Sequence, residues 1–229
     1  MKKHYFILLI SVLFVISGCA TTYKHEPIEM KVIDADTHEP LEGVIAVAIW
    51  TLSMGTVGGN VEVGTLQVLE AVSDNNGRIF FPAWGPLSPK KGLLDYRGAQ
   101  INLFKPGYLV ARYSNPIDGE HAGWRAEHPD RSPHDGATVK LRIESDFSKY
   151  IDRILFYDRD LNEVREGENC EWQKIPLTLV ELHKLSKELD QRGFKVEGWQ
   201  FGNRIQRLSD IYGEPHCASP EKFFEAYLK

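Results

Sequence analysis

The spacing of apolar residues changes near residue 143, and this change restricts the fold more than any other feature of the sequence. Between Ile28 and Ile143, apolar residues alternate with polar ones or form short β-branched runs bounded by turn residues. That pattern is typical of half-buried antiparallel strands. Beyond Ile143 the apolar residues recur every three or four positions, as on one face of a helix. We therefore expect a mainly β protein: an antiparallel β-sandwich followed by an α-helical C-terminal lobe.

Seven segments of the β region have the strand pattern. They are residues 28–33, 44–52, 66–73, 78–82, 100–104, 108–113 and 137–143. Residues Asp74 to Gly77 separate two of them, and the Asn and Gly residues there tolerate the positive φ angles of a tight hairpin turn. Seven short strands with regular turns favour a sandwich of two sheets. The segment Ser53 to Thr65 is rich in glycine and reads as an insertion between strands.

The helical pattern begins after an N-cap at Ser145 or Asp146, where Phe147, Ile151 and Leu155 lie on one stripe. Two shorter helices are expected near 205–211 and after 219–220. Each apolar stripe is narrow, so each helix needs a partner surface. Residues 145–229 are long enough for a small independent domain, but we favour a lobe appended to one sheet of the sandwich.

The longest expected helix begins near Pro176 and ends at Gly193. Thr178 and Glu181 have the spacing of a capping box, in which the side chains of the first turn satisfy main-chain N–H groups. The sequence therefore predicts that this helix supplies its own N-terminal cap.

Residues 1–18 have the organisation of a signal peptide. Lys2 and Lys3 precede an apolar run from Tyr5 to Ile16, which is shorter than the roughly 20 apolar residues that span a bilayer. The sequence of residues 16–19, Ile-Ser-Gly-Cys, resembles the lipobox of bacterial lipoproteins. This resemblance implies that the mature chain begins at an acylated Cys19. The alternative is a plain secretory signal in which the cysteine is incidental. Two or three acyl chains anchor a protein far more firmly than one.

The resemblance to lipoproteins also indicates where the chain resides. Residue 20 is Ala rather than the Asp of a common inner-membrane retention signal. We therefore expect a lipid anchor in the outer membrane, facing the periplasm, rather than in the inner membrane or at the cell surface. The expected organisation is a signal peptide at 1–18, a lipidated tether at 19–27, a β-sandwich at 28–144 and a helical lobe at 145–229.

With Cys19 acylated, Cys170 and Cys217 are the two remaining cysteines. In an oxidising compartment an even pair indicates a disulfide. Two separate buried thiols are the alternative, because sequence alone does not show that the two residues approach each other.

Three motifs in the β region resemble the carboxypeptidase regulatory-like domain, whose fold is a seven-stranded transthyretin-like (prealbumin-like) sandwich. They are Val32 to Val44, which includes Asp34, Thr37 and Pro40, then Ser73 to Phe81, and Lys105 to Tyr108. All three occur in the family's order. The main departure is His38, where the family usually has Gly; a positive φ at that site would cost a histidine on the order of 1 kcal/mol.

The resemblance implies a noncatalytic binding or assembly module with no cofactor and no catalytic residues to carry over. A formal net charge of -5 argues against a nucleic-acid partner, because phosphate binding needs clustered Lys and Arg. The expected partners are the lipid bilayer, through Cys19, and an envelope protein. One alternative is a lipoprotein subunit of an envelope or secretion complex, and another is a metal-dependent enzyme.

The enzyme alternative depends on the loop 118–135, which is rich in residue types that bind divalent metals. His121, His128, Asp130 and His134 are its candidate ligands. No pair has the one-turn spacing of a zinc-binding helix, and Pro129 and Pro133 disfavour a helix. A solvated loop accounts for the same residues, so the sequence assigns no metal site.

Trp124, in the same loop, is a weak candidate for a sugar-stacking surface. Its neighbours Gly123, Arg125 and His121 are polar or loop-like, whereas large aromatic residues more commonly fill cores. The sequence identifies no other ligand-binding residue.

Overall fold

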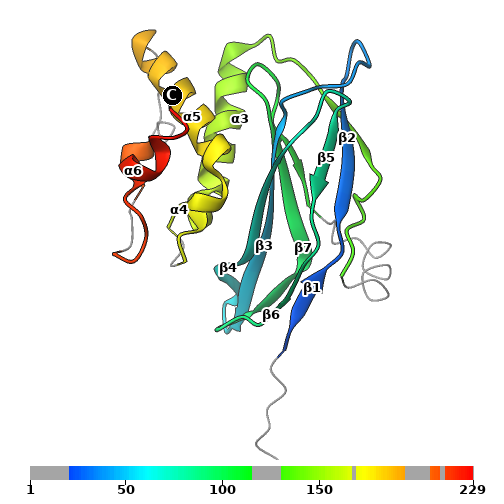
Figure 1. Cartoon of the computed structure of the whole chain (residues 1–229), viewed down its shortest axis with the longest axis vertical. Coiled ribbons are helices and arrows are strands. Elements are labelled where there is room, and N and C mark those ends of the chain that lie inside the picture. The colour runs from blue at the N-terminus through cyan, green and yellow to red at the C-terminus, as the bar shows by residue number, and fades with distance from the viewer. Residues whose placement is uncertain (1–20, 115–129, 167–168, 194–206, 212–214, 229) are drawn as a thin grey trace, which may run out of the picture.

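A computed structural model describes residues 21–114, 130–166, 169–193, 207–211 and 215–228. In this part of the chain two β-sheets face each other, and helices cover the outer face of one of them (Figure 1). The strands are β1 (Tyr23–His25), β2 (Ile28–Asp34), β3 (Ile45–Thr56), β4 (Gly59–Val72), β5 (Arg78–Phe81), β6 (Trp84–Leu87), β7 (Leu93–Phe104), β8 (Ala111–Tyr113) and β9 (Thr138–Leu141). The mainly β class and the sandwich predicted from sequence are thus confirmed.

The strand count and one strand pairing differ from the prediction. Each of the seven predicted segments overlaps a strand, but β1 and β6 add a two-stranded ribbon, so the described residues hold nine strands. The two main sheets have the orders β5-β2-β9 and β4-β3-β7-β8. Strands β2 and β9 run parallel, which corrects the wholly antiparallel expectation. Periodicity reveals that a segment is a strand but not which strand lies beside it.

Strand β3 is buried on both faces and explains the three-layer arrangement. Residues 45–50 form an uninterrupted apolar run, as expected where both faces of a strand are covered. Ile45, Val47 and Ile49 belong to the core shared with the helices, whereas Ala46, Ala48 and Trp50 belong to the core between the sheets. Because successive side chains point to opposite faces, this one strand connects both cores.

Two segments expected to be irregular form strands. The glycine-rich segment 53–65 continues the β3–β4 hairpin, where Met54 pairs with Val61 and Gly55 with Asn60. Within the predicted tether, residues 23–25 form β1, which pairs with β6. His25 lies within 5.1 Å of the Trp50 ring and 6.1 Å of the Trp84 ring, measured between centroids. The folded body therefore begins close to Cys19.

The turn after β2 is built around the carboxylate of Asp34. Its Oδ1 accepts hydrogen bonds from the main-chain N–H groups of Asp36 (2.8 Å) and Thr37 (2.9 Å), and its Oδ2 accepts one from the Tyr108 hydroxyl at 2.9 Å. These bonds hold the pKa of Asp34 below its ordinary value. His38 has a φ of 62°, so it occupies the left-handed conformation anticipated from sequence.

Gly77 brings the hairpin turn before β5 against β2. Its φ is +73°, and a Cβ atom at this position would lie 2.2 Å from the carbonyl oxygen of Val32. The Val32 N–H donates to the Gly77 carbonyl at 2.7 Å. Gly107 has a similar φ of +85°, but no atom lies within 4 Å of its hypothetical Cβ.

These two glycines provide a matched pair of substitutions. Gly107→Ala is expected to lower the free energy of unfolding by about 1 kcal/mol, because only the backbone conformation is disfavoured. Gly77→Ala should lower it by roughly 1–3 kcal/mol more, because the methyl group also collides with the main chain of β2. Urea denaturation of both variants measures the difference, and equal losses would contradict this account.

The helical lobe contains α3 (Phe147–Asp160), α4 (Asn162–Arg165), η1 (Glu171–Lys174), α5 (Pro176–Gln191), η2 (Leu208–Asp210) and α6 (Pro220–Phe224). The Asp146 side chain caps α3, as predicted, by accepting from the N–H groups of Ser148 and Lys149. Ser219 likewise caps α6. Of the expected helix near 205–211, residues 207–211 are described, and Leu208–Asp210 form a 3-10 turn. The sequence therefore located α3, α5 and α6 but did not predict α4 or η1.

Helix α5 is capped from the sandwich rather than by its own first turn. Its N-cap residue, Ile175, makes no side-chain cap bond. Instead the carboxylate of Glu70, on β4, accepts from the N–H groups of Leu177 (3.0 Å) and Thr178 (2.8 Å). The predicted capping box of Thr178 and Glu181 is therefore wrong, and Glu181 pairs with Lys184 instead.

Glu70→Ala is expected to lower the free energy of unfolding by about 1–2 kcal/mol, whereas the matched variant Glu181→Ala should change it by less than about 0.5 kcal/mol. Burial raises the pKa of Glu70 above 4.5, although the two N–H bonds oppose this shift. The contribution of Glu70 is therefore fully present below pH 4.5 and declines as pH rises through the raised pKa. Urea denaturation across this pH range should show a smaller Glu70→Ala effect at higher pH.

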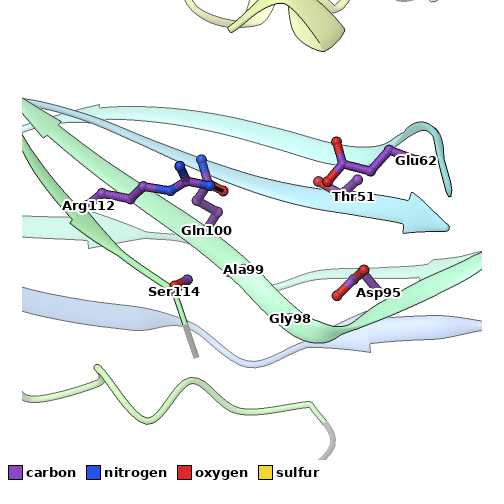
Figure 2. A pocket seen from close by; sticks show the side chains of 8 residues that line it. All are labelled: Thr51, Glu62, Asp95, Gly98, Ala99, Gln100, Arg112 and Ser114. Carbon is purple, nitrogen blue, oxygen red and sulfur yellow. Dashed lines mark hydrogen bonds between the residues drawn. The ribbon is translucent and has the colours of Figure 1, made fainter. Parts of the chain in front are cut away.

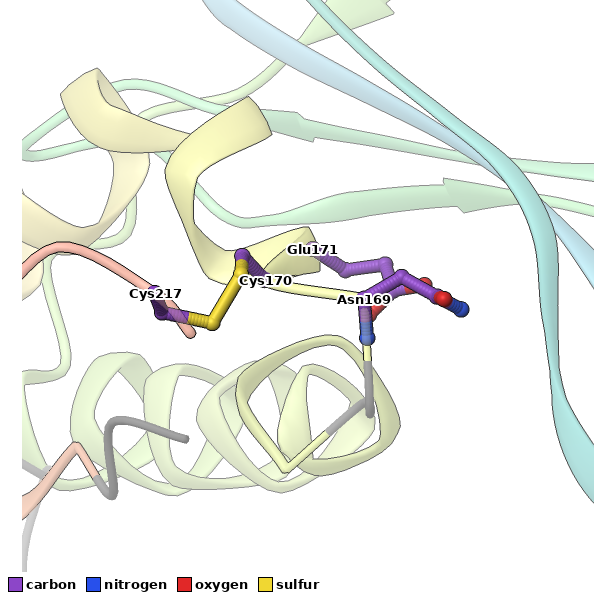
Figure 3. Close-up of a disulfide and its surroundings, with 4 residues drawn as sticks. All are labelled: Asn169, Cys170, Glu171 and Cys217. Carbon is purple, nitrogen blue, oxygen red and sulfur yellow. A yellow bond between two sulfur atoms is a disulfide. The ribbon is translucent and has the colours of Figure 1, made fainter. Parts of the chain in front are cut away.

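The lobe packs directly on the four-stranded sheet. A single core combines residues of β3, β4 and β7 with the buried faces of the helices. Within it, the Arg165 guanidinium forms an ion pair with the carboxylate of Asp158 and donates to the Asp158 carbonyl at 2.7 Å. The predicted disulfide is present, with Cys170 bonded to Cys217 (Figure 3). The lobe is thus tied to the sheet by packing and closed on itself by a covalent bond.

Candidate binding cleft

An open cleft of about 750 Å³ lies between the sandwich and the helical lobe. This cleft, called here the lobe cleft, is bordered by the β3–β4 hairpin, the segment between β6 and β7, and the residues around α4 and η1. Its lining residues are Leu52, Glu62, Val63, Gly64, Thr65, Leu66, Ser88, Pro89, Lys90, Lys91, Glu163, Glu166, Asn169 and Glu171. Its volume is in the range of ligand-binding sites, but its lining is more polar than that of most small-molecule pockets.

One wall of the lobe cleft is acidic. Burial raises the pKa of the Glu163 carboxyl, and the negative charges of Glu62 and Glu166 raise it further. The ionised form of Glu163 is therefore disfavoured in the absence of a ligand. A positively charged ligand group placed against this wall would relieve that repulsion, so the wall favours a cation.

Beside the disulfide, hydrogen bonds hold a further carboxylate of this wall, that of Glu171, in place. Glu171 is buried, and its two carboxylate oxygens accept hydrogen bonds from the main-chain N–H and the side-chain Nδ2 of Asn169, each at 3.0 Å. Cys170 lies between these two residues, as Figure 3 shows, and is bonded to Cys217. A ligand in the cleft would therefore meet a carboxylate whose orientation is set before binding.

The opposite wall carries Lys90 and Lys91, both exposed. The following residue, Gly92, has a φ of +72°, and a Cβ there would lie 2.7 Å from Val63 Cγ2 and 2.9 Å from the Ser53 carbonyl oxygen. Close packing of Gly92 on the hairpin thus places both lysines at the cleft. The sandwich thus contributes both lysines and Glu62 to the cleft, and the lobe contributes Glu163, Glu166 and Glu171.

A second, smaller pocket of about 40 Å³ shares Glu62 with the lobe cleft and is lined by polar residues, shown in Figure 2. Arg112 and Gln100 lie together at one end, where the Arg112 Nη2 donates to Gln100 Oε1 at 2.5 Å. Arg112 also pairs with Asp160 at 2.9 Å and lies over the Phe156 ring. A pocket of this size admits water but no organic ligand.

The predicted candidates of the polar loop are only partly described. His121, His128 and Trp124 lie outside the described residues. Asp130 Oδ2 lies 3.2 Å from Lys24 Nζ, and this lysine holds the pKa of Asp130 below its ordinary value. The His134 ring packs edge-on against Tyr113, 5.4 Å between centroids. The structure therefore gives these two residues contacts within the sandwich.

Among the described residues, one group of three metal-ligand types converges: Cys170, His216 and Cys217, whose ligand atoms lie within 4.8 Å of one another. Both sulfur atoms belong to the disulfide. The thiolates that a metal would need are therefore absent in this oxidised state.

Sequence reasoning did not single out the cleft residues. Glu163 and Glu166 fall in the segment 158–169, whose resemblance to a calcium loop fails at positions six and twelve. Another sequence feature among the cleft residues is the adjacent pair Lys90 and Lys91. Neither indicates a cleft, because its walls come from segments about 100 residues apart and meet only through the packing of the lobe on the sheet.

Neither a family model nor a curated protein sequence matches the chain. The backbone pilus protein 2b of group B streptococcus is similar over 54% of this chain and 43% of its own, at 16% identity and a TM-score of 0.26. Chlorocatechol 1,2-dioxygenase from Pseudomonas putida is similar over 52% of this chain and 61% of its own, at 17% identity and a TM-score of 0.25. A 9R-lipoxygenase from Cyanothece aligns over 73% of this chain and 28% of its own, at 13% identity and a TM-score of 0.25.

Less than two thirds of each of these three proteins is covered, and similarity at these scores assigns neither a fold family nor an activity. Within the described ranges, no helix has the length and apolarity needed to cross a bilayer.

Proposed function

We propose that this chain is a lipoprotein anchored through acylated Cys19 in the outer membrane and facing the periplasm. Its sandwich and helical lobe would act together as a noncatalytic binding or assembly module, and the lobe cleft would hold a segment of a partner protein. The observation that carries the binding function is the cleft itself, an open groove lined by several carboxylates and two lysines, whereas the anchor rests on the lipobox-like residues 16–19.

The finer family assignment is part of the same proposal. The three motifs that resemble the carboxypeptidase regulatory-like domain contact one another: Tyr108 of the third bonds to Asp34 of the first, and Gly77 of the second packs on Val32 of the first. Contacts of this kind support a common origin for the motifs as one folding unit. The family resemblance implies no catalytic role for these motifs.

The charges of the cleft suggest the chemistry of the partner segment. Lys or Arg side chains of the segment would face Glu163 and Glu166, and a carboxylate of the segment would face Lys90 or Lys91. An extended peptide suits an open polar groove, because its own main chain offers hydrogen bonds along its length. Binding should strengthen as pH rises through the raised pKa of Glu163, since the ionised form attracts the cation.

A photo-reactive amino acid placed at Thr65, inside the cleft, tests the binding function in intact cells. We expect a defined crosslinked partner that also copurifies from detergent-solubilised envelopes. The crosslink should disappear on Glu163→Lys and persist in the matched variant Glu225→Lys, which changes an exposed acid of the same lobe outside the cleft. No crosslink from Thr65, or one indifferent to Glu163→Lys, would contradict the cleft as the binding site. A stable large assembly would instead favour a subunit of an envelope machine.

Cys19→Ser tests the anchor separately. The substitution should release the protein from the membrane fraction into the soluble periplasmic fraction, because the acylated residue is lost. Mass spectrometry of the wild-type protein should find an acylated N-terminal Cys19. Continued membrane pelleting of the variant, or an intact segment 1–18, would refute the anchor.

A further inference from the structure

The far end of the β3–β4 hairpin is apolar and exposed. Residues 54–61, called here the hairpin tip, contain no charged side chain. Met54 and Val61 are paired across the hairpin and are 48% and 43% exposed, and Val57, in the turn, is fully exposed. Single exposed apolar residues are common on protein surfaces, but a group of them on one protruding element indicates an interaction surface.

A fourth apolar side chain flanks the hairpin tip. Leu93 pairs with Ser53 on β3 and is 59% exposed. Because successive side chains of a strand point to opposite faces, Leu93, which lies beside Ser53, and Met54 are on opposite faces of the sheet. Met54 and Val61 lie on one face of the hairpin tip and Leu93 of β7 lies beside the other, so exposed apolar side chains surround this end of the sheet. A protruding end of this kind is suited to shallow insertion into an apolar medium.

The hairpin tip lies at the end of the molecule where the chain begins. Tyr23, near the start of the described chain, pairs with Leu87. Residues 88–92 then connect Leu87 to Leu93, which pairs with Ser53 of the hairpin. In Figure 1 the start of β1 and the turn between β3 and β4 occupy the same end of the sandwich. The turn at Asp74 to Gly77, which connects β4 to β5, lies at the opposite end of the sandwich.

The distance from the lipid anchor to this end is short. Four residue steps separate Cys19 from Tyr23, and an extended chain covers at most about 14 Å in that length. If Cys19 is acylated, Tyr23 and the elements beside it must lie near the bilayer surface.

We propose that the hairpin tip inserts Met54, Val57 and Val61 into the interfacial layer of the bilayer that holds Cys19. This inference rests on the proposed lipid anchor. The acyl chains supply attachment, and the hairpin tip supplies a second point of contact that fixes the orientation of the body. Two contacts at one end would hold the lobe cleft at a constant height and angle above the membrane.

Fluorescence quenching of the full acylated protein tests this placement. A fluorophore attached through V57C is reconstituted into vesicles of phosphatidylethanolamine and phosphatidylglycerol that contain a nitroxide-bearing lipid. N76C, in the exposed turn at the opposite end, is the matched control. The native pair Cys170–Cys217 is bonded and leaves the new cysteine as the labelling site. We expect strong quenching at position 57 and none at position 76.

Two further variants show whether apolar contact causes the insertion. Met54→Ser with Val61→Ser, in the V57C background, should lower the inserted population at least about tenfold, because two apolar side chains lose their transfer into lipid. The control Val72→Ser changes a valine that is 42% exposed at the other end of β4 and should have no effect.

These outcomes distinguish a failure of the proposed insertion of the hairpin tip from a failure of the proposed lipid anchor. Protein that floats with the vesicles but shows equal quenching at positions 57 and 76 overturns the insertion and leaves the anchor intact. Protein that carries no acyl group and does not float overturns the anchor, and the inference falls with it. Quenching at position 57 that Met54→Ser with Val61→Ser does not reduce also overturns the insertion.

Discussion

Replacing Asp158 with Ala is expected to lower the free energy of unfolding by about 3–5 kcal/mol, because it leaves the guanidinium of Arg165 in the lobe core without its carboxylate. The two side chains are only 6% and 2% exposed. The Arg165 Nη1 also donates to the Asp158 carbonyl at 2.7 Å and to Asn162 Oδ1 at 3.4 Å. These bonds satisfy part of the guanidinium but do not neutralise its charge. Urea denaturation followed by circular dichroism measures the loss.

The double replacement Asp158→Leu with Arg165→Met distinguishes a buried charge from a general packing defect. It should cost much less than Asp158→Ala, because no unpaired charge remains in the core. Glu188→Ala provides a surface comparison. It breaks an ion pair with Arg192 whose side chains are more than half exposed, and it should change stability by less than about 1 kcal/mol. A loss for Asp158→Ala as small as that for Glu188→Ala would contradict the account.

Opening the disulfide is expected to lower the free energy of unfolding by up to about 4 kcal/mol. Cys170 and Cys217 are 47 residues apart, and a loop of that length removes about this much entropy from the unfolded chain. The closed segment includes α5 and η2, so the loss should fall mainly on the helical lobe. Hydrogen exchange with and without reductant should show faster opening in α5 than in β2.

The double variant Cys170→Ser with Cys217→Ser should match the reduced wild-type protein and show no further response to reductant. It should also weaken crosslinking from Thr65, because Asn169 and Glu171 of the cleft wall flank Cys170. An identical melting temperature for oxidised and reduced wild-type protein would contradict a stabilising role for the bond.

The N-termini of the helices show which helix caps can be predicted from local sequence and which cannot. Asp146 caps α3, as predicted, and Ser219 caps α6, because an N-cap side chain bonds to N–H groups two or three residues away. Helix α5 has the same local signal in Thr178 and Glu181, yet its cap comes from Glu70, 107 and 108 residues away from the two N–H groups. A cap contributed by another element leaves no trace in the helix's own sequence.

The sequence by itself determined the features that depend on neighbouring residues. These are seven of the strand segments, the positions of α3, α5 and α6, and the turn at Asp74 to Gly77. The sequence also favoured, without deciding, a disulfide between the last two cysteines. Each follows from side-chain periodicity, from the φ angles that a residue tolerates or from cysteine parity.

Only the tertiary structure decided which sheet the lobe covers, that β2 and β9 run parallel, that Asp158 and Arg165 share the lobe core, and that a charged cleft lies between lobe and sandwich. The physical reason is that these contacts join segments through the packing of whole elements. Periodicity reports that a face must be buried but not what buries it.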